Sequence, residues 1–286
     1  MTQKETEQEI HSIGSFIRTG LFVLSVVFVA SLAVAYGQNH LSQNASVSTG
    51  TQSTNTKKLP IYCVESKEKK IALSFDAAWG NDDTKRILSI LKKNKVHVTF
   101  FMTGGWIETY PEDVKAIYKA GHELGNHSEN HKQMSKLSAE ECKEEIMKPH
   151  EKVKKLTGVD MRVFRPPYGD YNNTLIETVE SCGYHAIQWD VDSLDWKDYG
   201  VDSILNTVLN HKHLGNGSII LCHNGAKFTA DALDTLIKEL KKKGYTFVKM
   251  SDLIYETDYE IDMEGRQHPK KTSETPEASS EAQKDT

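Results

Sequence analysis

The stretch KKIALSFDAAWGNDD, from Lys69 to Asp83, begins with an apolar run and becomes polar where that run ends. Residues 71–75 have the composition of a buried strand, and Asp76 follows them directly. In a parallel sheet, a strand that ends on a carboxylate places that group at the rim where functional residues gather. An isolated aspartate at this point can equally cap the next helix. The role of Asp76 therefore depends on which other residues lie beside it.

Beyond this strand the chain alternates between short apolar segments and amphipathic segments. The segment 111–121 is typical of a helix, with Pro111 at its start and Gly121 just past its end. The predicted strands, with the loops that follow some of them, are 70–75, 96–102, 122–128, 163–169, 184–192, 218–224 and 245–250. The predicted helices are 82–95, 111–121, 138–158, 172–183, 203–214 and 230–244. This alternation predicts an α/β fold with a parallel sheet, and we expect a deformed (β/α) barrel of about seven parallel strands.

The N-terminal part of the chain carries a signal for export. Residues 20–36 are uncharged and apolar apart from two serines, and they follow a polar segment, 1–19. A spanning helix needs about 20 apolar residues and a signal-peptide core about 7–15, so both a transmembrane anchor and a signal peptide fit. Small residues at 33–35 fit a cleavage site, whereas the long polar segment before Arg18 favours an uncleaved anchor. We expect a single-pass protein of the cell membrane with its folded domain outside the cytoplasm; secretion after cleavage is the alternative.

The remaining composition bounds the folded part and its partners. Residues 37–58 and 261–286 are polar and predict a flexible linker and a disordered tail, which leaves 59–260 as the domain. The formal net charge of −5 and the lack of a basic stripe exclude a nucleic-acid partner, and we expect a monomer. The four cysteines have no C-x-x-C spacing, so their disulfide state stays open. Cys182 and Cys222 lie in apolar settings and are expected to be small buried thiols.

Polar side chains follow five of the predicted strands: Asp76, His127, Arg165, Asp195 and His223. His127 and His131 are four residues apart, which would place both imidazoles on one side of a helical turn and allow them to share a metal. The same two histidines could equally be a solvated or buried pair without a metal. Arg165 precedes two prolines that fix the backbone direction, although a surface ion pair is the simpler interpretation. A histidine such as His223, close to a carboxylate, is a candidate general acid.

Five motifs in this order resemble the polysaccharide deacetylase family, also called carbohydrate esterase family four or the NodB homology domain. They are SFDAA (Ser74–Ala78), HSENH (His127–His131), RPPYG (Arg165–Gly169), DSLDW (Asp192–Trp196) and LCH (Leu221–His223). The resemblance spans about residues 71–250. Within the family, the first motif and the apolar N-terminal segment are most similar to the sporulation-type wall deacetylases of Gram-positive bacteria.

The resemblance implies a hydrolase that acts on amide bonds. Its expected activity is metal-dependent removal of N-acetyl groups from N-acetylglucosamine or N-acetylmuramic acid residues of cell-wall peptidoglycan. The family pattern implies that Asp76 is the general base, oriented by Arg165. It implies that His223 is the general acid and that Asp195 holds it.

The resemblance also implies how metal and substrate bind. The metal, zinc or another divalent ion, would bind to His127 and His131. The backbone N–H of Tyr168 would help to bind the oxyanion, and Trp196 and Leu221 would form the walls of the acetyl pocket.

One residue departs from the family pattern. Ala77 stands where the family usually has a second aspartate as the third metal ligand, and a methyl group cannot ligate. Two imidazoles alone bind a divalent ion more weakly than a three-ligand site, and Asp82 or Asp83 could supply the missing oxygen. The alternative function is therefore a non-catalytic glycan-binding protein that has lost a metal ligand. The retained acid and base residues favour the enzyme.

Overall fold

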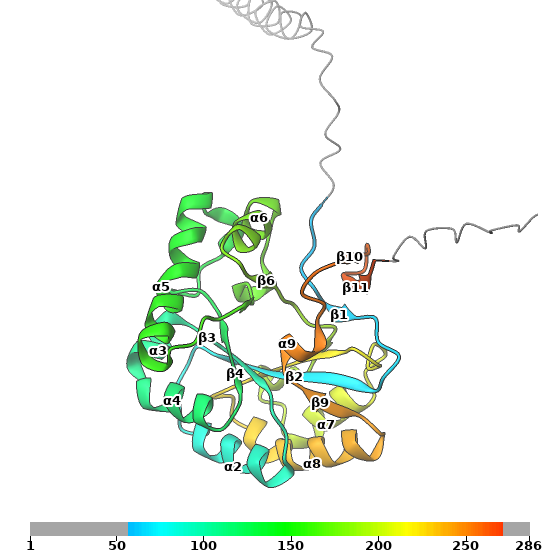
Figure 1. The fold of residues 1–286 in the computed structure, drawn as a ribbon. Helices are drawn as coiled ribbons and strands as arrows, with labels where there is room; N and C mark the ends of the chain where they lie inside the picture. Colours follow the sequence, from blue (N-terminus) through cyan, green and yellow to red (C-terminus); the bar gives the residue numbers. More distant parts are fainter. Residues whose placement is uncertain (1–56, 271–286) are drawn as a thin grey trace, which may run out of the picture. The chain divides into compact units, whose positions relative to one another are not determined.

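Strand β2 (Lys70–Ala77) forms the centre of the fold and is buried from Ile71 onward. The structure is a computed structural model, and it describes residues 57–270. The main sheet has eight strands, in the order β6-β5-β4-β3-β2-β8-β7 with β9 also paired to β2, and every pairing in it is parallel (Figure 1). The other strands of this sheet are β3 (Thr99–Met102), β4 (Glu123–Asn126), β5 (Val163–Phe164), β6 (His185–Ala186), β7 (Val191–Asp192), β8 (Ile219–His223) and β9 (Thr246–Val248). The predicted parallel α/β sheet is confirmed.

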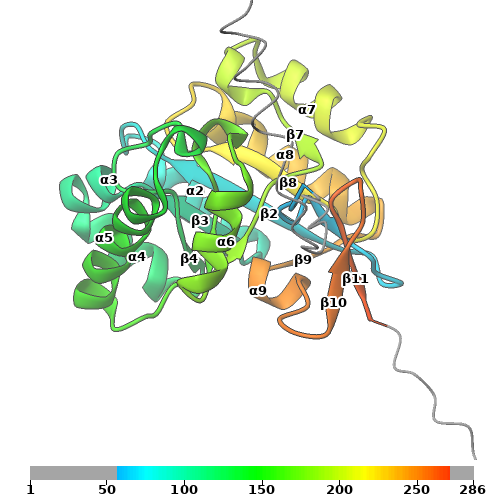
Figure 2. The ribbon, with the colours of Figure 1, turned by 90° about the horizontal axis from the view of Figure 1, so that it is seen from above.

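Helices cover the outside of this sheet, as Figures 1 and 2 show. They are α2 (Thr84–Asn94), α3 (Gly104–Thr109), α4 (Pro111–Lys119), α5 (Ala139–Thr157), α6 (Asn173–Ser181), α7 (Val201–Leu209), α8 (Thr229–Lys242) and α9 (Met250–Leu253). Three short 3₁₀ turns are η1 (Met134–Lys136), η2 (Pro167–Gly169) and η3 (Asp195–Lys197). The start of α5 shows why the longer helices could be predicted. Ser138 accepts from the Glu141 N–H while the Glu141 carboxylate accepts from the Ser138 N–H, which is a capping box.

The sheet is curled so far that its two edges are joined by a very short segment. Residues 184–192 were expected to form one strand, but they form two: β6 lies at one edge of the sheet and β7 at the other. Only residues 187–190 separate them, so the two edges lie at most about 18 Å apart along the chain. Ile61 fills this seam by bridging to Ile187, with Ile61 N donating to Ala186 O and Gln188 N donating to Ile61 O. The fold is therefore a deformed barrel, as expected.

A second sheet has three strands, in the order β1-β11-β10, and begins with β1 (Cys63–Val64) (Figure 1). It contains β10 (Tyr259–Ile261) and β11 (Arg266–Pro269). The predicted start of the disordered tail at residue 261 is therefore wrong. Gln267 is fully buried, and its side chain exchanges hydrogen bonds with the backbone of Tyr255. These strands are short and polar and their partner is distant in sequence, so they leave no local apolar pattern.

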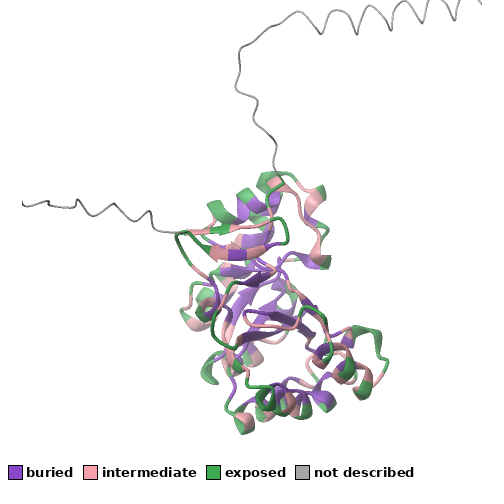
Figure 3. Ribbon diagram, turned by 90° about the vertical axis from the view of Figure 1, so that its right-hand side faces the viewer, coloured by how far each residue is buried: buried purple, intermediate pink, exposed green. Residues whose placement is uncertain are grey.

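The alternation of side chains along β2 creates two apolar layers. Ile71, Leu73 and Phe75 belong to the larger cluster, which lies under the helices, whereas Ala72 belongs to a smaller cluster that includes Phe101 and Met250. Figure 3 shows the buried strands surrounded by helices whose outer faces are exposed. Because side chains alternate along a strand, Asp76 lies on the same side of β2 as Ala72, at the carboxyl end.

Two further predictions concern the N-terminal apolar segment and the cysteines. The expected anchor or signal helix at 20–36 lies outside the described residues. None of the helices between residues 57 and 270 is both long and apolar enough to cross a membrane. All four cysteines are free thiols; Cys222 is buried as expected, but Cys182 is only partly buried.

Candidate active site

The carboxyl ends of β2 and β5 bring Asp76 and Arg165 into direct contact. Arg165 Nη1 donates to Asp76 Oδ1 over 2.7 Å, and Arg165 is completely buried. The guanidinium carbon of Arg165 lies 4.1 Å from the centre of the Phe101 ring, so the two groups are in contact. A surface ion pair is thus the wrong interpretation of Arg165. Burial alone would raise the pKa of Asp76, but the charge of Arg165 and those of His127 and His223 outweigh it and lower that pKa. Asp76 is therefore a carboxylate at neutral pH.

The two motif histidines lie side by side, although not on a helix. Residues 127–131 form a loop after β4, in which Ser128 and His131 have left-handed backbone angles (φ 66° and 53°). Ser128 N donates to Asn126 Oδ1 and His131 N donates to Ser128 Oγ, so side chains rather than helical carbonyls hold this turn. The predicted helical turn is wrong, but the ring centres of His127 and His131 are still only 4.9 Å apart.

His127 is fixed in one orientation. Its Nδ1 lies 2.7 Å from the carbonyl oxygen of Arg165, so Nδ1 carries the proton and Nε2 is free to accept. Nε2 lies 3.5 Å from Asp76 Oδ2. Burial lowers the pKa of His127 to about 4 and also lowers that of His131. Both imidazoles are therefore neutral at neutral pH, the form that binds metals.

His223, at the carboxyl end of β8, is held by a buried carboxylate. Its Nδ1 lies 2.7 Å from Asp195 Oδ1, and Asp195 Oδ2 accepts from Thr229 Oγ1 over 2.6 Å. His223 is the residue on β8 that pairs with Asp76 in the β2–β8 register, so the two side chains begin on neighbouring strands. Burial would lower the pKa of His223, but the hydrogen bond with Asp195 and the charges of Asp195, Asp76 and Asp192 outweigh it and raise that pKa.

These residues surround one cavity of about 490 Å³. It is lined by Asp76, Trp79, His127, His131, Pro166, Tyr168, Trp189, Asp192, Trp196, Leu221 and His223. Every predicted site residue is in this lining except Arg165 and Asp195, which lie buried behind it. The structure therefore brings the whole predicted set together.

The mouth of this cavity is aromatic. Trp79, Tyr168 and Trp196 have more than half of their surface exposed. The ring centres of Trp79 and His131 are 5.5 Å apart, and those of Tyr168 and His131 are 4.5 Å apart. No role was predicted for Trp79 or Trp189 from the sequence; the available signal was a tryptophan in the loop that follows Asp76. Tyr168 has φ 60°, and its backbone N–H has no hydrogen-bond partner among residues 57–270.

Asp83 does not approach the histidines as a ligand. Its carboxylate accepts from the N–H of Gly225, at 3.0 and 3.1 Å, and so joins the loop after β2 to the loop after β8. Thr84 Oγ1 adds a second link to Asn224 Oδ1 at 3.0 Å. The suggestion that Asp83 supplies the missing metal ligand is therefore wrong; it holds the loop that follows His223.

The metal that the family pattern implies is matched by only part of this site. His127 and His131 are neutral, adjacent and, in His127, oriented by a carbonyl as metal-binding imidazoles usually are. The third position is Ala77, whose methyl group is fully buried and packs in the apolar cluster under the helices. No group of three or more histidine, cysteine or acidic residues suited to a metal exists within the described part of the chain. The site thus fits two protein ligands and does not fit three.

Comparison with known proteins agrees with this geometry. Residues 64–187 match the family model described as polysaccharide deacetylase. The peptidoglycan-N-acetylmuramic acid deacetylase PdaA of Bacillus subtilis is 33% identical over 70% of this chain and 77% of its own length. A peptidoglycan-N-acetylglucosamine deacetylase of Bacillus cereus is 36% identical over 67% of this chain and 91% of its own length. A solved structure described as a CE4 family pseudoenzyme from Bacillus anthracis has a TM-score of 0.66 and 33% identity, and the alignment covers 73% of this chain and 72% of that one.

Proposed function

We propose that this chain, which belongs to the polysaccharide deacetylase family of amide-bond hydrolases, removes N-acetyl groups from the amino sugars of cell-wall peptidoglycan. The observation that carries the proposal is the placement of Asp76 and His223 on neighbouring strands at one cavity, with Arg165 and Asp195 buried behind them. The relatives named as peptidoglycan deacetylases support the choice of substrate. The aromatic mouth supports it as well, since flat rings pack well against the apolar faces of sugars.

The chain's own residues account for the proton transfers. The Asp76 carboxylate, kept ionised by Arg165, takes a proton from water as the water oxygen bonds to the acetyl carbon. The carbonyl oxygen becomes an oxyanion, to which the N–H of Tyr168 can donate. His223 is bonded through Nδ1 to Asp195, so Nε2 is the nitrogen that donates a proton to the departing amine. The C–N bond breaks, and the products are acetate and a free amino sugar.

Within this proposal, His127 and His131 would hold a divalent metal, for which zinc is the first candidate. When bound, the ion supplies positive charge that polarises the acetyl carbonyl. With two protein ligands, its affinity should be lower than that of a three-ligand centre. The neutral state of both imidazoles supports the assignment.

The test is release of acetate from purified peptidoglycan, with the sugar products identified by mass spectrometry after muramidase digestion. Loss of one acetyl group from the glucosamine or from the muramic acid residue distinguishes the two substrates. A wild-type chain that is folded, supplied with zinc and still releases no acetate from either sugar would contradict the proposal.

A second candidate function is glycan binding without hydrolysis. Ala77 and the lack of a three-ligand group in the described residues favour it, and one structurally similar protein is described as a pseudoenzyme. This candidate predicts that wild type binds peptidoglycan fragments but gives the same acetate signal as an Asp76→Asn variant. The enzyme predicts a signal at least tenfold above that variant.

The cellular setting is also a proposal. The apolar segment 20–36 supports a protein anchored in the cell membrane with its domain outside the cytoplasm, where the wall lies. Mature protein should then stay with membranes after an alkaline wash. Recovery of a soluble form whose N-terminus is near Tyr36 would show a cleaved signal peptide instead. The similarity to sporulation-type enzymes adds that the modified glycan should be found in spore walls, and sedimentation of the solubilised protein should give a monomer.

A further inference from the structure

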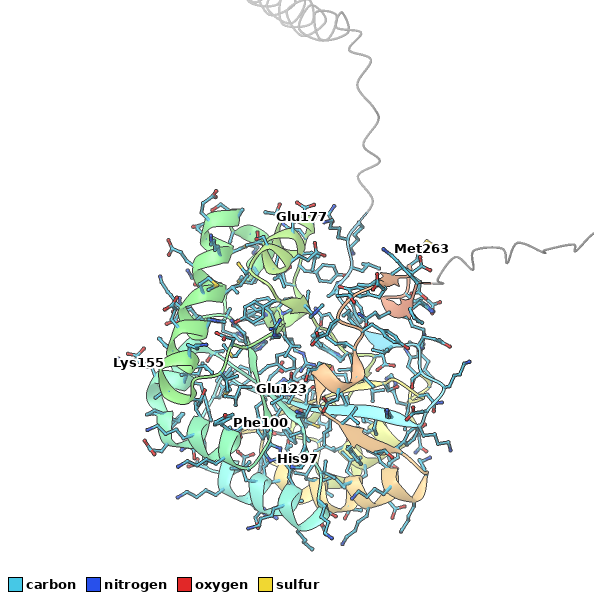
Figure 4. All side chains as sticks on the ribbon, in the orientation of Figure 1. His97, Phe100, Glu123, Lys155, Glu177 and Met263 are labelled. Carbon is cyan, nitrogen blue, oxygen red and sulfur yellow. The ribbon has the colours of Figure 1, made fainter. Side chains whose placement is uncertain are left out.

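The barrel carries a second cavity, which runs along α2 and reaches the end of the sheet opposite Asp76. Its volume is about 710 Å³, and its lining residues come from α2, α4 and the loops that lead into β3 and β4. They are Lys85, Leu88, Ser89, Leu91, Lys92, Lys95, Val96, His97, Lys119, Ala120 and His122. Because His97 and His122 precede the amino ends of β3 and β4, this cavity is separate from the carboxyl ends that form the active site. Figure 4 labels His97 at the lower part of the view.

The charged side chains that line this cavity are all positive. Four lysines line it and no aspartate or glutamate does, although the whole chain has a net charge of −5. Within residues 57–270, none of the four lysines has a carboxylate oxygen within 4.0 Å of its ammonium group. The pKa of Glu112 is lowered mainly by its hydrogen bond with Lys115, and the charge of Lys119 adds a smaller effect without forming an ion pair.

Lysines at the ends of helices also compensate the helix dipole, but this compensation accounts for only part of the positive charge of the cavity. The carboxyl ends of α2 and α4 both lie at the cavity, and each carries roughly half a negative charge. Two such ends offset about one of the four positive charges. The remaining charge, about three, is not offset by any ion pair within residues 57–270.

A largely buried histidine in the cavity wall adds a second, independent observation. His122 is 5% exposed, and its Nδ1 accepts from the backbone N–H of Val98 over 3.3 Å. Nε2 therefore carries the ring proton, and no described residue accepts a hydrogen bond from it. Burial lowers the pKa of His122 to about 4, so the ring stays neutral and keeps this arrangement at neutral pH. This N–H is not one of the buried side-chain donors that lack a partner, so it is open to solvent, and at the wall of a cationic cavity it can donate to an anionic ligand with acceptor oxygens.

We propose that this cavity is a binding site for a phosphate-bearing ligand, with Lys85, Lys92, Lys95 and Lys119 neutralising its charge and His122 Nε2 donating to one of its oxygens. Phosphate offers two negative charges and several acceptor oxygens within one small group, and lysine is a common point-charge partner for it. The apolar floor of Leu88, Leu91 and Val96 leaves room for a carbon skeleton attached to the phosphate. Binding here leaves the active-site end of the barrel free. The site would therefore hold the protein to a phosphate-bearing component while the opposite end acts on glycan.

The test is calorimetric titration of the full-length chain with inorganic phosphate and then with glycerol phosphate, at constant ionic strength maintained with chloride. The variant is Lys92→Gln/Lys119→Gln. The matched control is Lys143→Gln/Lys155→Gln, which removes two exposed lysines of α5 that have no ion pair in the described residues; Figure 4 labels Lys155 on α5, away from His97. The cavity variant should bind glycerol phosphate at least about tenfold more weakly than wild type, while the control should bind as wild type does. All four lysines are exposed, and Lys92, Lys119 and Lys155 each lie in the last turn of a helix, so both variants should melt only slightly below wild type and close to each other.

A vesicle-binding experiment identifies the source of the phosphate. Full-length wild type and the cavity variant are floated with vesicles of phosphatidylglycerol and, separately, of phosphatidylcholine. A difference between the two proteins only with phosphatidylglycerol, combined with weak binding of glycerol phosphate, assigns the site to a lipid headgroup. Tight binding of glycerol phosphate without such a difference assigns it to a soluble or wall-bound phosphate ester. Equal phosphate affinity for wild type and the cavity variant, or an equal loss in the control, would overturn the proposal.

Discussion

Asp195 contacts His223 at two points: Oδ1 lies 2.7 Å from the ring Nδ1, and Oδ2 accepts from the backbone N–H of His223, also over 2.7 Å. The carboxylate is itself completely buried. A ring held in this way has one tautomer and one direction, so its Nε2 can serve as a proton donor at a fixed place.

Replacing Asp195 should change the pH dependence of activity. Asp195→Asn removes the main group that raises the pKa of His223, so His223 should lose its proton at a lower pH. A general acid must be protonated to act, and the alkaline limb of the profile of kcat/KM against pH should therefore move to lower pH. Thr229→Val removes only the neutral hydrogen bond to Asp195 and should move that limb less. An alkaline limb unchanged in Asp195→Asn would contradict the role of His223.

Asp76→Asn and His223→Ala should each lower turnover by about 10²-fold or more, the usual scale for acid–base groups. Their stabilities should differ. Asp76→Asn leaves the fully buried Arg165 without its carboxylate, and breaking a buried pair costs about 3–5 kcal/mol. The double variant Asp76→Asn/Arg165→Met should regain part of that stability without regaining activity. Denaturation curves and acetate release measure the two effects separately; a stability loss as large in His223→Ala would mean that His223 is mainly structural.

Ala77→Asp should create the third metal ligand. A carboxylate in this fully buried position destabilises the metal-free protein, so the variant should melt at a lower temperature in chelator than wild type does. Zinc should raise that melting temperature and bind more tightly than to wild type in a calorimetric titration. Ala77→Asn, which has the same shape and no charge, is the control, and His127→Ala should abolish binding in every background. A destabilised Ala77→Asp that gains no zinc affinity would show that residue 77 cannot reach the histidines.

Asp83→Ala should loosen the loop that follows His223. Loss of the bond to Gly225 should lower stability by about 1 kcal/mol and lower kcat more than it changes KM, because the general acid is then less well placed. Asp82 is exposed and its side chain makes no hydrogen bond to described residues, so Asp82→Ala is the neighbouring control. Identical kinetics for the two variants would contradict a positioning role.

The acid stability of the domain should depend on His122. Its pKa of about 4 in the folded protein lies below the usual value of 6.5, so the unfolded chain binds more protons between these values. The contribution of neutral, buried His122 to the free energy of unfolding is therefore fully present above about pH 6.5 and is lost as the pH falls towards 4. His122→Gln cannot take up this proton, so the difference in urea midpoint between wild type and variant should shift in favour of the variant across that window. Parallel curves from pH 7 to pH 4 would contradict the assignment.

The long periodic elements and the order of polar residues at strand ends were predictable from sequence, because each depends on local apolar spacing. Helices α3 and α9 were missed since six and four residues are too few to show a period. Strand β11 was missed because its partner, β1, is remote. The contacts of Asp83 and the bend at His131 depend on side-chain-to-backbone hydrogen bonds, which no pattern of residue types specifies.

The seam filled by Ile61 and the strand pair β1–β11 together determine when this barrel can be completed. Arg266 Nη1 donates to the carbonyl oxygen of Val64, 202 positions earlier in the chain. Contacts between such distant residues require closing a very large loop, which slows folding. The last strand to be synthesised therefore pairs with the first.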